Sequence, residues 1–130
     1  MPRACLIVCL VLFEVAPSFA CEAPTRLGYN APVELEGTLK EDKGQHDAQG
    51  EFTYAYLALD KPVCVDAPPE GDEFNASTDA PIGRIQMAGE ANTKDLPIGK
   101  HVVVKGTLFG AHTMWHVEPV LIDAEAVEPK

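Results

Sequence analysis

Apolar and polar residues alternate along most of this chain, a pattern typical of half-buried β-strands rather than of helices. In residues 33–40, apolar side chains stand at 33, 35 and 39 between charged and polar neighbours. Residues 52–59 are more continuously apolar, which indicates a central strand covered on both sides, and the pattern continues through Pro62 to Val65. Three further candidate strands are residues 82–87, residues 102–108 and residues 115–127, the last interrupted at Pro119.

Five strands with a long connection between the third and the fourth are the layout of an OB-fold. Residues 33–39 and 102–108 also share the frame V-x-[LV]-x-G-T-L. This repeat is either chance similarity between β-rich segments or a structural signal in which Gly37 and Gly106 let two strands bend where a barrel closes. We therefore predict a mostly β, five-stranded, OB-like Greek-key barrel. At most one short helix fits, around residues 88–96, between strands three and four.

Two polar segments separate the first three strands and are predicted to be loops. Residues 41–50 join strands one and two, and residues 66–81 join strands two and three. The second segment holds five acidic residues, three prolines and no basic residue, so we expect it to be mobile and solvated. Its Asn75-Ala76-Ser77 fits the glycosylation pattern, but so short a match is common by chance.

The N-terminus resembles a secretory signal peptide. Arg3 precedes an apolar stretch at residues 4–13, a proline follows at Pro17, and Ser18-Phe19-Ala20 fits the small-x-small cleavage rule. This stretch is about half as long as the roughly 20 residues that span a bilayer, so no transmembrane segment is predicted. The alternative is a buried N-terminal strand or helix. We expect residues 1–20 to be removed, which leaves a single OB-like domain at residues 21–130 with its core at about residues 30–127.

Cleavage after Ala20 would leave two cysteines, Cys21 and Cys64. A pair of cysteines in an exported chain indicates a disulfide and an oxidising compartment such as the bacterial periplasm. Because Cys21 would be the first mature residue, a lipid-anchored form through Cys21 is the alternative. Ser18 and Phe19 fit the lipidation pattern poorly.

Composition limits the classes of function. A length of 130 residues allows one domain, and a net charge of −10 argues against nucleic acid and anionic membrane surfaces as partners. The same charge favours a cationic partner, such as a basic protein, a polyamine or a metal cation, through electrostatic steering. No nucleophile elbow, phosphate-binding glycine loop or H-E-x-x-H motif is present, so no catalytic residue is predicted and an enzyme is the less favoured interpretation.

The segment GTLFGAHTMWHVEPVL, residues 106–121, resembles the G-T-L-F-x-A-H-T-x-x-H-x-x-P-V-L hallmark of a family of small exported bacterial proteins with a domain of unknown function. Residues 59–65 likewise resemble that family's L-D-x-P-x-C-V. Where family members often have a second histidine directly before the last one, this chain has Trp115. The resemblance implies an exported protein of unassigned activity.

The same segment holds the candidate chemistry. His112 and His116 are spaced H-x3-H, which places both on one face of a helix but about 13 Å apart on a strand, so shared metal ligation requires a turn between them. OB-folds bind ligands near the loops that join strands one–two and four–five, which makes His46 or Asp47 the natural third ligand. A divalent metal is the one cofactor that this reading allows.

Loop pinning is the alternative role for these residues. A histidine beside a turn often holds the loop in place by hydrogen-bonding to its backbone, and His112 and Thr113 could both act in this way. Trp115 is interpreted as a side chain that fills the core or its edge rather than as a platform for base stacking. Two functions follow. The first is a non-enzymatic, exported OB-like module that binds a cationic partner or a small ligand. The second is a metal-binding protein that uses His112, His116 and His46.

Overall fold

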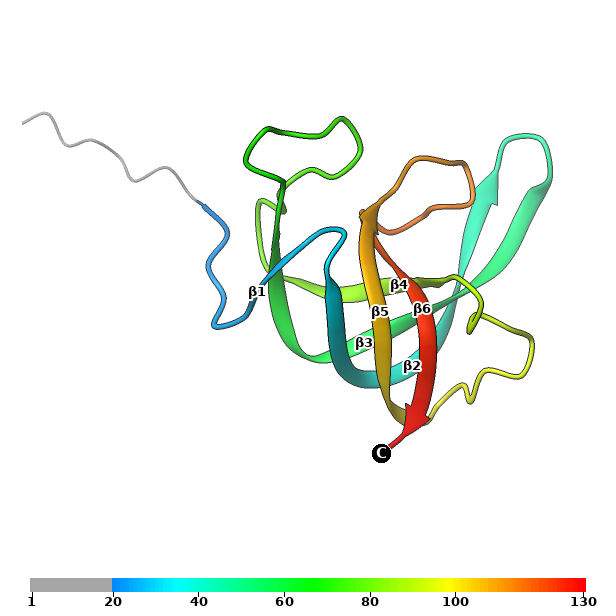
Figure 1. Ribbon diagram of the computed structural model, residues 1–130. Coiled ribbons are helices and arrows are strands. Elements are labelled where there is room, and N and C mark those ends of the chain that lie inside the picture. The colour runs from blue at the N-terminus through cyan, green and yellow to red at the C-terminus, as the bar shows by residue number, and fades with distance from the viewer. Residues whose placement is uncertain (1–19) are drawn as a thin grey trace, which may run out of the picture.

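The computed structural model describes residues 20–130, so the predicted signal peptide lies outside the described residues except for Ala20. This part of the chain contains strands, turns and irregular segments and no helix. Residues 88–96, where at most one short helix was predicted, are the end of a strand followed by turns. The six strands are β1 (Arg26–Gly28), β2 (Pro32–His46), β3 (Gly50–Asp66), β4 (Ile82–Ala88), β5 (His101–Gly110) and β6 (Val120–Pro129) (Figure 1).

Five of these strands close into a barrel. Strand β2 pairs antiparallel with both β3 and β5, β5 pairs antiparallel with β6, β6 runs parallel to β4, and β4 pairs antiparallel with β3. Counted from β2, the barrel order is one–two–three–five–four and back to one, which is an OB-like Greek-key arrangement. The predicted small five-stranded barrel is confirmed. The extra strand β1 adds to β3 in parallel.

The barrel interior is filled by the apolar positions of the alternating pattern. Burial of these side chains is the main favourable contribution to folding, because it removes apolar surface from water. Both halves of the chain contribute to one core. Its fully buried large side chains are Leu39, Leu57, Cys64, Val65, Ile85, Val102, Val104, Leu108, Val120, Leu121 and Ile122.

The repeated glycine of the V-x-[LV]-x-G-T-L frame is required by close backbone approach. A Cβ atom on Gly37 would overlap the carbonyl of Ala58 on β3, and a Cβ atom on Gly106 would overlap the carbonyl of Asp123 on β6. The β5–β6 register also shifts between Lys105 and Gly106. In both halves of the repeat, glycine is therefore required where a neighbouring strand passes too close for a Cβ atom. This supports the structural interpretation of the repeat over chance.

Two predicted boundaries are wrong. Residues 41–50 are not a loop, because β2 continues to His46 and forms a hairpin with β3 that leaves a turn at residues 47–49. The hairpin tip projects beyond the barrel, so its residues lack the alternation that a core imposes (Figure 1). The last strand begins at Val120 rather than at 115, because residues 111–119 form a loop. Strand β1 was not predicted.

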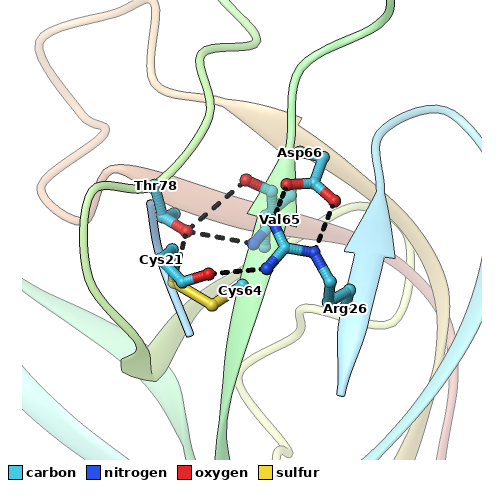
Figure 2. The surroundings of a disulfide bond; sticks show 6 residues. All are labelled: Cys21, Arg26, Cys64, Val65, Asp66 and Thr78. Atoms are coloured by element: carbon cyan, nitrogen blue, oxygen red, sulfur yellow. Dashed lines mark hydrogen bonds and ion pairs between the residues drawn. A yellow bond between two sulfur atoms is a disulfide. The ribbon is translucent and has the colours of Figure 1, made fainter. Parts of the chain in front are cut away.

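The predicted disulfide is confirmed. Cys21 and Cys64 are bonded, with their Cα atoms 5.9 Å apart (Figure 2). Beside it, the Arg26 guanidinium donates to the Cys21 carbonyl at 2.6 Å and to both oxygens of Asp66 at 2.6 and 3.1 Å. This hydrogen-bonded pairing lowers the pKa of Asp66. The disulfide and the Arg26–Asp66 pair together fasten the N-terminal segment to β3.

Candidate functional site

Three connections gather at one end of the barrel (Figure 1). We call this the loop end and define it as residues 41–51, 66–81 and 111–119. Of the five large apolar side chains that are exposed in the described chain, four lie here, namely Phe74, Met114, Trp115 and Val117. The same three segments hold ten acidic residues and one basic residue, Lys43. The loop end therefore combines exposed apolar surface with most of the net negative charge.

His112, Thr113 and His116 lie together in the loop between β5 and β6. The Nδ1 atom of His116 accepts hydrogen bonds from the backbone N–H groups of His112 at 3.0 Å and of Thr113 at 3.2 Å. Thr113 Oγ1 accepts from the N–H of Trp115 at 3.2 Å. The two imidazole rings meet edge to face with centroids 4.7 Å apart. The loop contains the turn that shared metal ligation by the two histidines would require. The hydrogen bonds between these side chains and the loop backbone are those expected for loop pinning.

The hydrogen bonds assign different tautomers to the two histidines. His112 Nδ1 lies 3.0 Å from the carbonyl oxygen of Gly110, which can only accept, so this nitrogen carries the proton. His116 Nδ1 accepts two N–H groups and must be unprotonated. Burial lowers the pKa of His116, and the neighbouring His112 lowers it further. In the neutral pair, the exposed His112 keeps the lone pair of its Nε2 atom.

His46 and Trp115 meet across two connections. His46 Nδ1 accepts the N–H groups of Ala48 and Gln49, both at 3.1 Å, which closes the β2–β3 turn where Asp47 lies exposed. The His46 ring lies against Trp115 with centroids 4.3 Å apart. Because Trp115 also contacts Phe52 and remains 46% exposed, it lies at an edge rather than in the core.

Among residues 20–130, the three ligand-type side chains that meet at metal-binding spacing are Glu36, Asp60 and His101, rather than His46, His112 and His116. His101 Nε2 lies 2.6 Å from Asp60 and 3.7 Å from Glu36, which Lys130 also contacts at 2.9 Å. The hydrogen bond that His101 donates to the Asp60 carboxylate raises the pKa of His101. These groups already pair with one another and with Lys130, and the raised pKa of His101 shifts it toward the protonated form, which cannot ligate a metal.

Gln86 is a site residue that the sequence pattern did not reveal. It is 5% exposed, and its Oε1 atom accepts the N–H groups of Val117 at 2.7 Å and Glu118 at 3.1 Å. Its Nε2 atom donates to the carbonyl of Trp115 at 2.8 Å. In the sequence Gln86 occupies a polar position of a short strand, which indicates solvent exposure. The loop that covers it comes from thirty residues further on, so no local signal could find it.

A charged network continues from this loop along the outer face of the sheet. Tyr54 donates to Glu118 at 2.8 Å and accepts from Arg84 at 3.0 Å, and Arg84 also binds Asp42 at 2.9 Å. Arg84 Nε is 2.9 Å from Glu118, close enough for an ion pair although its N–H is not aimed at the oxygen. Burial and the Glu118 bond raise the pKa of Tyr54 to about 12. The guanidinium also lies 3.7 Å from the centroid of the Tyr56 ring, a cation–π contact.

The acidic segment 66–81 contacts residues 110–119, which form the end of β5 and the loop that carries His112 and His116 (the histidine loop). Asn75, 8% exposed, accepts the N–H of Gly110 through its side-chain oxygen at 2.8 Å and donates its amide to Asp72 at 3.2 Å. Phe74 contacts the His112 ring at a centroid distance of 5.7 Å. Both sides of the Asn75 side chain are therefore engaged, so this asparagine has a structural role.

A cleft of about 360 Å³ lies next to Trp115. The cleft lies between residues 51–55, which we call the outer half of β3, the end of β4 and the turns at residues 92–98. Its aromatic side chains come from β3 and from the β5–β6 loop, and its charged ones are one acid and one base. The lining residues are Glu41, Phe52, Thr53, Tyr54, Ala55, Gln86, Met87, Asn92, Thr93, Lys94, Leu96, Ile98 and Trp115.

Residues 84–128 match the family model described as a domain of unknown function, DUF4431. The matched segment runs from within β4 into β6 and includes the histidine loop, which agrees with the resemblance to an uncharacterised family. Neither the curated proteins nor the solved structures contain a significant match to the chain. Within residues 20–130, no helix is long and apolar enough to cross a membrane. The comparisons therefore assign no activity.

Proposed function

We propose that the protein is an exported, non-enzymatic binding module that holds a small ligand or part of a cationic partner in the cleft beside Trp115. The observation that carries this proposal is the cleft itself. At about 360 Å³ it falls within the volume range of small-molecule sites. It lies against the second and third strands of the barrel, next to the loop that joins the fourth and fifth, where OB-like barrels bind their ligands.

Glu41 and Lys94 balance each other within the cleft lining, but the negative charge around the cleft favours cations. The loop end holds ten acidic residues against Lys43, and Glu41 lines the cleft directly. Aromatic faces attract cations, and Trp115, Phe52 and Tyr54 all lie in the lining. The net charge of −10 would also speed the encounter with a positively charged partner at low ionic strength.

The disulfide supports export. Disulfides persist in oxidising compartments, and the bacterial periplasm is the compartment we propose. The Sγ atom of Cys21 is bonded to Cys64, and one sulfur cannot also carry a thioether-linked lipid. The disulfide-bonded form therefore favours an exported protein without a lipid anchor at Cys21.

A histidine-bound divalent metal is the second candidate function, favoured by the contact between the His112 and His116 rings. His112 Nε2 has a lone pair to offer, but His116 would have to turn and release two backbone N–H groups. To become a third ligand, His46 would likewise have to release the N–H groups of Ala48 and Gln49 from its Nδ1 atom. Elemental analysis of untagged protein tests this function. Stoichiometric metal that is lost in His112→Ala would establish it.

Trp115 is the single tryptophan of the chain, so its fluorescence reports on the cleft. We expect spermidine or a lysine- and arginine-rich peptide to change the emission of Trp115 saturably, with an affinity that falls as salt is added. An acidic peptide of equal length is the matched control. Calorimetry with Trp115→Phe checks that the signal follows binding. Absence of both heat and fluorescence change with every cation would refute the proposed function.

A further inference from the structure

The outer half of β3 has a free edge. On one side, β3 pairs with β2 along residues 50–59. On the other side, its pairing with β4 ends at Tyr56, which lies opposite Gln86. Beyond that point β4 turns to β6, and among the described residues the segment Glu51–Ala55 has β2 as its one strand partner. Within residues 20–130, no backbone hydrogen bond from a turn or loop reaches these five residues.

This free edge opens into the cleft. In an antiparallel ladder, alternate residues direct their N–H and C=O groups away from the strand they pair with, so the segment presents unpaired backbone groups on its open side. Thr53 and Ala55 belong to the cleft lining, which faces the wall formed by Leu96 and Ile98. Trp115 lies at the same opening. The cleft is therefore a groove with the backbone of β3 along one wall and, along the other, the apolar side chains of Leu96 and Ile98 beside the polar ones of Asn92, Thr93 and Lys94.

We propose that the ligand of this cleft is an extended, basic peptide segment that adds as a strand to the edge of β3 at Glu51–Ala55. The proposal deepens the proposed function and rests on it. Strand addition obtains affinity from main-chain hydrogen bonds and specificity from pockets for alternate side chains. Here Trp115 and Phe52 would receive side chains on one face of the added strand, and Leu96 and Ile98 would contact the other.

Charge selects the occupant. Glu41 lines the groove, and Asp47 lies exposed in the adjoining turn, so arginine or lysine side chains of the added strand would find carboxylates. Lys94 is the one basic residue of the lining. The same charge opposes self-association through this edge, because two copies would bring two loop ends of ten acidic residues and one basic residue together. A basic segment from another protein would both pair with the free edge of β3 and complement the negative charge of the loop end.

Backbone methylation of the ligand tests the proposal. The parent is an eight-residue peptide of alternating basic and aromatic residues, and two derivatives carry N-methyl groups at the odd or at the even amides. Both derivatives keep the charge and the side chains, but in a strand only one set of amides faces β3. We expect one derivative to bind at least about tenfold more weakly than the parent and the other to stay within about twofold. Amides of Glu51–Ala55 should gain hydrogen-exchange protection when the parent binds.

Variants of the protein test the charge argument on the same peptide. Glu41→Gln should weaken binding at least about threefold at low salt, because it removes the carboxylate in the groove. Glu125→Gln removes the same charge from an exposed position of β6 outside the cleft lining and should leave binding unchanged. An equal effect of the two variants would mean that only net charge matters, which overturns recognition in this groove.

The outcomes separate this proposal from the proposed function. If both methylated peptides bind as well as the parent, strand addition is wrong while cation binding stands. If spermidine binds and the peptide does not, the peptide is the wrong ligand class. If the protein alone forms a dimer in sedimentation that protects Glu51–Ala55, the edge serves self-association and the proposal is overturned. If nothing binds, the proposed function itself fails.

Discussion

Two buried polar side chains, Gln86 and Asn75, and the partly buried His116 hold the loop end in place. Gln86 bonds three backbone groups of residues 115–118, His116 bonds two of residues 112–113, and Asn75 joins the acidic segment to Gly110. A backbone group that is removed from water and left without a partner costs about 1–3 kcal/mol, so Gln86 and Asn75 stabilise their loops by preventing that loss, whereas the backbone groups that His116 bonds are exposed and gain less. The position of Trp115 depends on these bonds rather than on a hydrophobic core of its own.

Replacement of Gln86 tests this dependence. Gln86→Leu keeps the approximate size but leaves the N–H groups of Val117 and Glu118 and the carbonyl of Trp115 unpaired. We expect a loss of about 2–3 kcal/mol in the free energy of unfolding, measured by denaturant titration. Trp115 emission should shift to the red as the loop loosens. Gln49→Leu, at an exposed turn position, is the control and should change stability by less than about 0.5 kcal/mol. Equal stability of the two variants would contradict the pinning role.

The pH dependence of stability tests His116. Because burial and His112 lower its folded-state pKa below the ordinary 6.5, the unfolded chain takes up a proton first as pH falls. The stabilisation from His116 is therefore fully present above about pH 6.5 and is lost as pH falls toward the lowered folded-state pKa. His101, whose pKa is raised, acts in the opposite sense. The comparison must therefore be made between variants.

His116→Asn provides that comparison. The amide oxygen of asparagine stands where Nδ1 stands in histidine, so it can accept the same two N–H groups without titrating. We expect the difference in unfolding free energy between wild type and His116→Asn to move in favour of the variant as pH falls from 7 to 5. A difference that stays constant over this range would show that His116 does not titrate with folding.

At the scale of elements, hydrophobic periodicity predicts the strands whose side chains face the core. It does not predict segments whose contacts are made by loops. The barrel strands were identified because alternate residues such as Leu35, Leu39, Val102 and Val104 must face one core. The end of β2 was missed because the hairpin tip has no core to face. Only the part of this loop from residue 115 onward is wrongly predicted as strand, because Trp115 and Val117 imitate alternation. Gln86 and the free edge of β3 depend on contacts distant in sequence, which no local pattern encodes.

The two glycines of the repeat provide the sharpest test at this scale. Gly37→Ala and Gly106→Ala each place a Cβ atom against a carbonyl of the neighbouring strand, so backbone must shift in a rigid barrel. Overpacking of this kind costs about 1–3 kcal/mol or more, and we expect at least about 2 kcal/mol for each variant in thermal or denaturant unfolding. Gly83→Ala, on β4 with no atom within 4 Å of the new Cβ, is the matched control and should be nearly neutral. Comparable losses of stability in all three variants would indicate that the change from glycine to alanine, rather than overlap with a neighbouring carbonyl, causes the loss.

Considered as a whole, the molecule separates stabilisation from recognition. Neither cysteine of the disulfide lines the cleft beside Trp115, although the disulfide borders the acidic segment 66–81, where Thr78 donates to Cys21 Sγ at 3.6 Å. Concentrated like charge weakens the folded state through self-repulsion, and a small domain has only about 5–15 kcal/mol in total. A cross-link between Cys21 and Cys64 offsets that repulsion without occupying the binding surface. Stability should therefore depend strongly on the disulfide, whereas cation binding should depend on the loop end.

The double variant Cys21→Ala/Cys64→Ala tests this separation. The disulfide closes a loop with a sequence separation of 43 residues, for which the chain-entropy model gives about 4 kcal/mol. For a domain of this size, each 1 kcal/mol corresponds to roughly 4–8 °C, so we expect the melting temperature to fall by roughly 15–30 °C. At a temperature where the variant remains folded, spermidine should still change Trp115 emission with an affinity within about twofold of wild type. Loss of binding in the folded variant would show that the disulfide shapes the cleft, and the separation would not hold.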